Sequence, residues 1–397
     1  MSQNKKTNHH LQAGIMKDGK LKVALAGLGF GKAFVPIWCK HPDVYEVDII
    51  EPDEKRVADF LNYWSKYITI NKCWTSFEEA LEDETIDAVH IVTPIPLHAK
   101  QAITALNAGK HCASTVPMAT SLEDIQAIID AQRKSGKNYM MMETAVYTYP
   151  FLKIKQDVKD GLFGGIQLLR GCHYQDMENW PPYWKGLPPM WYGTHAISTS
   201  LALTGCRACE VHCYGSGVMR EDLQTLYHNP YPAETAIFRL ENHPAALEVT
   251  RTLFQTARSY CEGLSVYGEK RTIDWSYGNG PDCYELLDTS NPKAFGYPTY
   301  REPFKAPDTG WMLPKEIAPF TRSGKYDDLN PSTTFEVSGG HHGSHPHLVH
   351  EFARSIIENR RPAIDAYTAA DWTAAGICAH ESAMRNGELV KIPDFRK

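Results

Sequence analysis

A glycine-rich turn between an apolar run and a helical segment is the strongest constraint on the fold of this chain. The run beginning at Lys22 leads directly into Gly27-Leu28-Gly29-Phe30-Gly31. Glycines permit the sharp turn with which a buried strand passes into a helix lying on the sheet. Between residues 22 and 146, further short β-rich runs alternate with helical stretches. This alternation is typical of a parallel sheet with helices on both faces.

Capping signals support the same interpretation. Ser121, with Asp124 three residues later, predicts the start of a helix that ends at Gly136. A second helical stretch ends at Gly109. The five strands expected in this part are KVALAGLGF, EVDIIEPD, DAVHIVTP, KHCASTVP and NYMMMETAV.

The pattern changes after Pro150. One helix is expected over 150–161, and β-rich runs then follow each other with few helices between them, which favours an antiparallel or mixed sheet. The stretch 276–340 has little periodicity and many Pro, Gly and Asp residues, so we expect a long functional loop or covering arm there. Two helices, at about 347–359 and 368–385, close the chain. The five strands expected here are GGIQLLRGCHYQ, ACEVHCYGSG, AETAIFRLEN, ALEVTRTLFQ and GLSVYGEK.

The fold class is therefore α/β, in two domains after a short tail. We expect a polar tail over 1–20, a Rossmann domain with a doubly wound parallel sheet over 21–147, and a C-terminal α+β domain over 148–397. The second domain is expected to be built on an open, mostly antiparallel sheet. A chain of 397 residues is long enough for two such cores.

Composition limits the partners and the compartment. The net charge of −6 gives no electrostatic reason to bind nucleic acid or anionic lipid. No run approaches the roughly 20 apolar residues that span a bilayer, and the first twenty residues lack the apolar stretch of a secretion signal. Ten scattered cysteines in a chain of this length fit a reducing compartment, so we expect a cytoplasmic protein.

The glycine turn also predicts a cofactor. Such a turn lets a pyrophosphate approach backbone N–H groups at a helix N-terminus. Glu51 ends the second expected strand, about 20 residues further on, as a dinucleotide site requires. A carboxylate there accepts hydrogen bonds from a ribose 2′-hydroxyl and repels a 2′-phosphate, which favours NAD over NADP. Lys32 stands where a third small residue is usual.

Several of these segments together resemble the Gfo/Idh/MocA oxidoreductase family. They are GLGFGKAF, TPIPLHAKQAITALNAGKH, the Val-Pro strand end and the mixed-sheet second domain, and the resemblance spans nearly the whole chain. It implies that Thr93, Pro94 and His98 border the nicotinamide ribose, and that the open second sheet supports homo-oligomers. The next strand of the family usually ends in Glu-Lys-Pro with a catalytic lysine, where this chain has Thr115-Val116-Pro117. The predicted cofactor contacts are Gly27, Gly29, Phe30, Gly31, Glu51, Thr93, Pro94, His98, Thr115, Val116 and Pro117.

A second family signature places a histidine at a helix start facing the nicotinamide. The family pattern Asp-x-Gly-x-His, with another Asp three residues later, corresponds here to residues 191–198, which keep His195 and lack both acids. An imidazole is the natural acid/base group at neutral pH, so His195 is the main catalytic candidate. Tyr192 and Lys185 are further catalytic candidates, and His173 is an alternative acid/base group or a substrate contact.

The segment between the two signatures is rich in aromatic residues that suit sugar rings. Trp180, Trp184 and Trp191 are candidate stacking platforms, although they could equally pack over the sheet. Further along, residues 339–347 hold four histidines, of which His342 and His345 are predicted to contact substrate. Neither this run nor Cys206, Cys209 and Cys213 has a recognised ligand pattern, so we assign no metal site from the sequence.

Three functions remain open on these residues. The first is hydride transfer between tightly bound NAD and a ring carbon of a sugar or glycoside. The resemblance to a family branch with Val-Pro and Tyr-x-Thr-His implies carbon 3. The second is an NAD-dependent glycosidase that oxidises, eliminates, adds water and re-reduces in one site. The third is a dinucleotide or sugar sensor without catalysis. Residue types do not specify the sugar, its anomer, the leaving group or the oligomer size.

Overall fold

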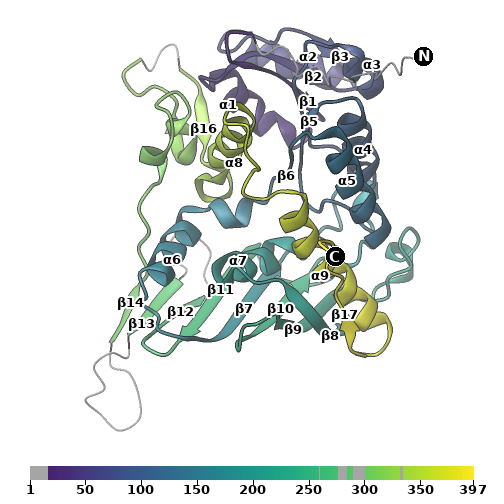
Figure 1. Cartoon of the computed structure of the whole chain (residues 1–397), viewed down its shortest axis with the longest axis vertical. Coiled ribbons are helices and arrows are strands. Elements are labelled where there is room, and N and C mark those ends of the chain that lie inside the picture. The colour runs from purple at the N-terminus through teal and green to yellow at the C-terminus, as the bar shows by residue number, and fades with distance from the viewer. Residues whose placement is uncertain (1–16, 259, 276–283, 289–299, 331–333) are drawn as a thin grey trace, which may run out of the picture.

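The computed structural model describes residues 17–258, 260–275, 284–288, 300–330 and 334–397. The first sixteen residues of the expected polar tail lie outside this set. Two sheets form the framework, and the chain crosses from one to the other after residue 141 (Figure 1). No helix in the described ranges has the length and apolar character that crossing a bilayer requires.

The N-terminal sheet is parallel, as the alternating pattern predicts. It has six strands in the order β3-β2-β1-β4-β5-β6, one more than the five expected, and β3 is the strand that was missed. Its central strand β1 is completely buried. The strands are β1 (Leu21–Ala26), β2 (Val44–Ile50), β3 (Cys73–Trp74), β4 (Ala88–Ile91), β5 (His111–Ser114) and β6 (Tyr139–Met141). The helices are α1 (Val35–Lys40), α2 (Glu54–Trp64), α3 (Phe77–Glu82), α4 (His98–Asn107) and α5 (Leu122–Ser135).

The expected caps of α5 are confirmed. The Ser121 side chain accepts a hydrogen bond from the Asp124 backbone N–H, and Gly136 ends the helix in the left-handed conformation with φ of 66°. Both features follow from local chemistry, because serine satisfies a free N–H at a helix start and glycine adopts positive φ at little cost.

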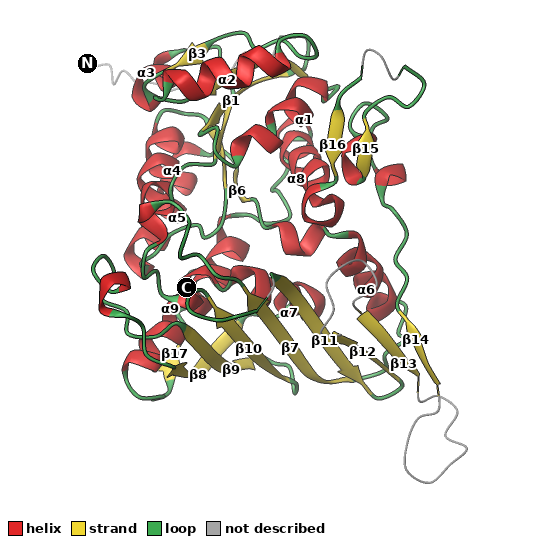
Figure 2. Cartoon of the chain, turned by 180° about the vertical axis from the view of Figure 1, so that it is seen from behind, coloured by secondary structure: helices red, strands yellow, loops and turns green. Residues whose placement is uncertain are grey.

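The C-terminal sheet has nine strands in the order β14-β13-β12-β11-β7-β10-β9-β8-β17. All neighbours are antiparallel except β7 and β10, so the expected open, mostly antiparallel sheet is confirmed. Helices α6 (Tyr149–Lys159) and α7 (Thr194–Thr204) lie on the face toward the N-terminal sheet (Figure 2). The strands are β7 (Ile166–Tyr174), β8 (Ala208–Ser216), β9 (Ala233–Leu240), β10 (Ala246–Thr252), β11 (Cys261–Gly268), β12 (Arg271–Trp275), β13 (Tyr284–Asp288), β14 (Tyr300–Pro303) and β17 (Val390–Lys391).

The expectation of an irregular arm over 276–340 is wrong in part. Strands β13 and β14 extend the sheet beyond β12, and β15 (Ser323–Lys325) pairs with β16 (Glu336–Ser338). Residues 276–283, 289–299 and 331–333 of that stretch lie outside the described residues. A sheet edge can add strands through backbone hydrogen bonds alone, so the side-chain periodicity of the sequence did not predict these strands.

Helices α8 (Gly340–Ile357) and α9 (Ala366–Met384) close the chain, close to the expected ranges. Helix α9 packs against β8 on one side and against α5 and β6 on the other, so it joins the two sheets. The range of α8 begins before its expected start near His347 because it includes a left-handed turn, in which His341, His342 and Gly343 have positive φ (47°, 49° and 79°). The right-handed helix follows this turn, close to the expected start, and the strained turn has no regular helix signal in the sequence.

Candidate active site

The glycine turn lies at the carboxyl end of β1, where dinucleotides bind in sheets of this kind. Gly27 has a φ of 94°, and a Cβ atom placed there would lie 2.5 Å from the Val92 carbonyl oxygen. A Cβ on Gly29 would meet no atom within 4 Å. The turn therefore combines one close backbone approach with one open position, and both features suit a pyrophosphate.

Glu51 ends the neighbouring strand and is held firmly. Its Oε2 accepts hydrogen bonds from the Leu28 N–H (2.8 Å) and from Arg56 (3.1 Å), and its Oε1 accepts one from the Asp53 N–H. The side chain is 3% exposed. The carboxylate thus lies beside the glycine turn, as expected for a group that receives a ribose hydroxyl.

The other predicted cofactor contacts lie at the carboxyl ends of β4 and β5. His98 is fully buried, with Nδ1 2.8 Å from the Pro117 carbonyl oxygen and Nε2 2.9 Å from that of Thr93. Pro94 and Thr115 stand in the same two loops, and Val116 joins Pro117 through a cis peptide bond. His98 therefore ties the two loops together, and all eleven predicted contacts lie along or near one edge of the sheet.

His195 lies near the start of α7 and is paired with a buried carboxylate. Its Nδ1 donates to Glu143 Oε1 at 2.6 Å, and the Tyr192 hydroxyl lies 3.3 Å from Nε2. Burial opposes the charged imidazole, but the nearby carboxylates of Glu143 and Glu262 outweigh it and raise the pKa of His195. Burial also raises the pKa of Tyr192. The carboxylate thus fixes the orientation of the imidazole, the arrangement found in many acid/base pairs.

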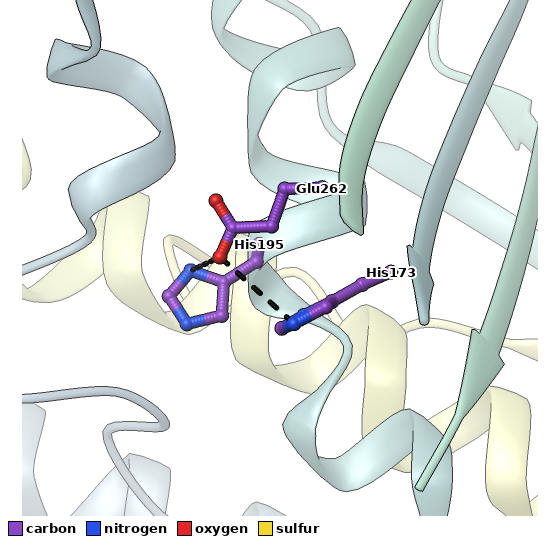
Figure 3. Close-up of side chains that lie close together, drawn as sticks. All are labelled: His173, His195 and Glu262. Atoms are coloured by element: carbon purple, nitrogen blue, oxygen red, sulfur yellow. Dashed lines mark ion pairs between the residues drawn. The ribbon is translucent and has the colours of Figure 1, made fainter. Parts of the chain in front are cut away.

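Two side chains from the C-terminal sheet face His195. Figure 3 shows Glu262 of β11 and His173 of β7 pointing toward it. Glu262 Oε1 lies 3.9 Å from His195 Nδ1 and 3.9 Å from His173 Nε2. Burial raises the pKa of Glu262, but the imidazoles of His195 and His341 and a hydrogen bond from Tyr260 outweigh it, so the pKa is lowered. His195, Glu262 and His342 line one cavity, with α6 forming another wall.

Arg251 holds the backbone next to His195 and its neighbours in place. It is completely buried, and it donates to the carbonyl oxygens of Tyr192 (3.0 Å), His173 (3.1 Å) and Thr252, and to the Gln175 side chain. Burial lowers the pKa of Arg251 to about 10. One guanidinium thus fixes the backbone of two residues whose rings lie beside His195.

We expect Arg251→Met to lower the free energy of unfolding by about 3 kcal/mol, because several buried carbonyl groups lose their donor. Denaturant unfolding followed by circular dichroism measures this change. The control is Arg239→Met on neighbouring β9, whose side chain is 76% exposed. The control should stay within about 0.5 kcal/mol of the parent chain, and equal losses in both variants would contradict the prediction.

The histidines at the start of α8 contact the region of the glycine turn on one side and the cavity on the other. His345 is buried, with its Nε2 2.9 Å from His341 Nδ1, and its ring packs against Phe30 and Phe34 near the glycine turn. His342 lies at the cavity, where its ring contacts Tyr149. The structure thus places His342 where it could touch a substrate, while His345 lies nearer the cofactor turn.

The remaining predicted residues lie outside the described lining of the cavity. The Lys185 side chain is 44% exposed and lies 4.0 Å from Asp222. Trp180 is 51% exposed and contacts Trp184, which is buried in a separate apolar cluster and contacts the Tyr192 ring. Trp191 packs edge-on against Tyr227 and His380. Their predicted roles stay predictions.

Sequence reasoning missed Glu143 and Glu262. Glu143 follows the last parallel strand, and a polar residue at the carboxyl end of such a strand is itself a signal of a site. Glu262 gave a weaker signal, a carboxylate in an otherwise apolar strand. It becomes informative only through its direct pairing with His173 across β7 and β11.

Comparison with known proteins agrees with this geometry. Residues 21–143 match a family model described as oxidoreductase family, NAD-binding Rossmann fold. The N-terminal domain of this chain is thus similar to the NAD-binding domain of the Gfo/Idh/MocA oxidoreductase family. NAD is therefore the cofactor of this oxidoreductase, and the open glycine turn and Glu51 fit it.

Curated relatives and solved structures extend the comparison to the second domain. The chain is 23% identical to a glycosyl hydrolase family 109 protein of Saccharopolyspora erythraea over 95% of this chain and 83% of the relative. It is 41% identical to an α-N-acetylgalactosaminidase of Shewanella oneidensis, over 24% of this chain and 20% of the relative. A levoglucosan dehydrogenase in complex with NADH and levoglucosan has the same fold, with a TM-score of 0.73 and 22% identity over 94% of this chain and all of that chain.

The pairing of Glu143 with His195 leads to a direct prediction. Glu143→Gln keeps the shape of the side chain but removes the charge that orients and stabilises the imidazolium. We expect kcat to fall by about 10²-fold with little change in NAD content. Steady-state kinetics and the cofactor released on denaturation measure the two quantities. Unchanged kcat would show that the carboxylate does not act through His195.

Proposed function

We propose that this oxidoreductase transfers a hydride between NAD and a ring carbon, carbon 3, of a sugar or glycoside. The observation that carries the proposal is the buried Glu143–His195 pair, whose histidine lines a cavity. The fold shared with a levoglucosan dehydrogenase bound to NADH and its sugar supports a carbohydrate substrate. When bound, NAD supplies the group that accepts the hydride.

The chain's own residues then perform the proton chemistry. The imidazole of His195 accepts the proton of the substrate hydroxyl, and Glu143 stabilises the imidazolium that results. Hydroxyl recognition falls to Glu262 and His342, which face the same cavity. Apolar side chains such as Phe151 and Leu264 complete the lining and suit the less polar face of a sugar ring.

Glycosidic cleavage through the same oxidation is the second candidate. The family 109 glycosyl hydrolases and the α-N-acetylgalactosaminidase among the relatives favour it. Once the ring carbon is a ketone, the neighbouring C–H becomes acidic, and elimination needs a second base. Glu262, with its pKa lowered, is a second carboxylate in the cavity that could take this proton.

One experiment separates the candidates. The protein is purified without added cofactor, part is denatured to identify released dinucleotide, and the rest is incubated with a glycoside panel in deuterated water and followed by NMR. A keto-sugar with NADH formed from added NAD supports hydride transfer alone. Released aglycone, or deuterium at carbon 2, with no net NADH supports cleavage with the cofactor recycled. NAD binding without hydride exchange on any glycoside would reject both enzymatic candidates and support a non-catalytic sensor of a dinucleotide or a sugar.

Assembly and compartment belong to the proposal as well. We expect a homo-oligomer joined through the outer face of the C-terminal sheet, where Tyr214 and Ile237 are 63% and 56% exposed. Light scattering on the purified protein tests this, since a monomer contradicts it.

The buried free thiols of Cys112, Cys213 and Cys378 support a cytoplasmic location, which cell fractionation tests.

A further inference from the structure

Three potential metal ligands from three separate elements converge at the cavity. They are His173 on β7, His195 on α7 and Glu262 on β11, and one donor atom of each lies within 4.8 Å of the others. Figure 3 shows the three side chains pointing toward a common centre. This group shares no residue with the histidine run at 339–347, which the sequence alone singled out.

His173 provides an independent sign of a missing partner. Its side chain is 1% exposed, and neither ring nitrogen has a hydrogen-bond partner among the described residues. Buried polar atoms in folded proteins are nearly always satisfied, so a buried imidazole with two unpartnered nitrogens calls for an explanation, and a bound ion is one. Its Nε2 faces Glu262 Oε1 at 3.9 Å, too far for a hydrogen bond and suitably placed for a shared ligand.

We propose that His173, His195 and Glu262 bind a divalent transition-metal ion of the zinc class. Two imidazoles and one carboxylate form the donor set of catalytic zinc sites, which keep a further position open for water or substrate. Magnesium and calcium prefer oxygen ligands, so the imidazoles select against them. Ligands at about 2.1 Å from an ion bring donor atoms somewhat closer than 3.9 Å, a change that small side-chain rotations supply.

Charge and position also favour an ion. Glu143 and Glu262 are two carboxylates near one imidazole nitrogen, His195 Nδ1, at 2.6 and 3.9 Å. Without an ion, a proton on that nitrogen and the buried Arg251 guanidinium balance the two negative charges, and a divalent ion would replace the proton. The ion takes the place of the proton that His195 shares with Glu143, and Glu143 becomes a fourth ligand or a neighbour that orients the site.

The consequence for catalysis rests on the proposed function. The open position of the ion faces the cavity and takes a hydroxyl oxygen of the sugar. An ion lowers the pKa of a bound hydroxyl, so the O–H bond breaks with its proton passing to water and its electron pair remaining on the oxygen. In the ion-bound form the metal, instead of the imidazole, stabilises that oxygen while the neighbouring C–H gives up its hydride.

Metal content of the purified protein tests the site without any activity assay. The full-length chain is stripped with chelator, dialysed separately against Zn²⁺, Co²⁺, Mn²⁺, Fe²⁺ or Mg²⁺, and analysed by mass spectrometry of the metals. We expect about one ion per chain for at least one of the transition metals, none for Mg²⁺, and visible absorption bands with Co²⁺. Failure of all four transition metals to bind would overturn the proposal.

Matched variants locate the ion. His173→Gln and Glu262→Gln each remove one ligand, and we expect the affinity to fall by about 10-fold or more. His342→Gln removes a histidine from the same cavity that is not in the group, and it should keep its ion. Equal binding by the parent chain and His173→Gln would place the ion elsewhere and overturn the proposal. Thermal unfolding checks the fold of each variant, and the parent chain decides the question if a variant does not fold.

The experiments test the proposed function and the metal site independently of each other. A bound ion with no oxidation of any glycoside rejects the sugar oxidoreductase and keeps the metal site. Hydride transfer by a chain that binds no transition metal rejects the metal site and keeps the oxidoreductase. In that second case His195 acts through its proton alone.

Discussion

Replacing His195 with asparagine is expected to lower kcat by about 10³-fold on any glycoside that the parent protein oxidises. Among the described residues of the cavity lining, His195 is an acid/base group for neutral pH whose orientation Glu143 fixes. Asparagine retains a polar side chain of similar reach but neither accepts a proton nor ligates zinc well. Steady-state kinetics with the best substrate of the panel gives the change.

NAD binding should survive this substitution. His195 belongs to α7, whereas the glycine turn and Glu51 directly follow the first two strands of the N-terminal sheet. Cofactor released from the denatured variant should therefore match that of the parent chain. His212→Asn is the matched control, because His212 is exposed on β8 and lies outside the cavity lining. Full turnover by His195→Asn with saturating substrate would remove both the proton-transfer role and the ligand role from His195.

The framework of both sheets could be predicted because local signals and global fold agree there. Ser121, Asp124 and Gly136 set the ends of α5 through contacts within a few residues, so the sequence carries them directly. The position of the glycine turn predicted where the first strand ends, and therefore which edge of the sheet holds the predicted cofactor contacts. Strands β13 and β14 were missed because edge pairing depends on the neighbouring strand more than on their own side chains.

The candidate site was predicted less completely because it is assembled from distant segments. His195 was found through a family motif, but its partner Glu143 is 52 residues away and meets it only in the folded chain. Lys185 was chosen for its nearness to His195 in sequence and Trp191 as an aromatic platform for sugar rings. Both roles stay predictions, since Lys185 lies near Asp222 and Trp191 packs against Tyr227. Nearness in sequence is a weak guide at a site that joins three elements from two sheets.

Gly27→Ala should remove NAD binding and destabilise the fold at the same time. The added Cβ would lie 2.5 Å from the Val92 carbonyl oxygen, and the φ of 94° is one that alanine rarely adopts. Together these effects should cost about 3 kcal/mol of unfolding free energy. Because the turn must open to relieve the contact, we expect the affinity for NAD to fall by about 10²-fold. Denaturant unfolding and calorimetric titration with NAD measure the two effects.

Gly29→Ala separates the loss of NAD binding that comes from a distorted turn from the loss that comes from a filled pyrophosphate position. Its Cβ would meet no protein atom within 4 Å, and its φ lies outside the positive region, so the unfolding free energy should change by less than about 0.5 kcal/mol. The methyl group would instead occupy space that a pyrophosphate needs, so the affinity for NAD should still fall. Weakened NAD binding in a normally stable Gly29→Ala protein would assign the open side of the turn to the cofactor. If Gly29→Ala bound NAD as tightly as the parent chain, the cofactor would have to approach the sheet elsewhere, and the placement of the pyrophosphate at this turn would be wrong.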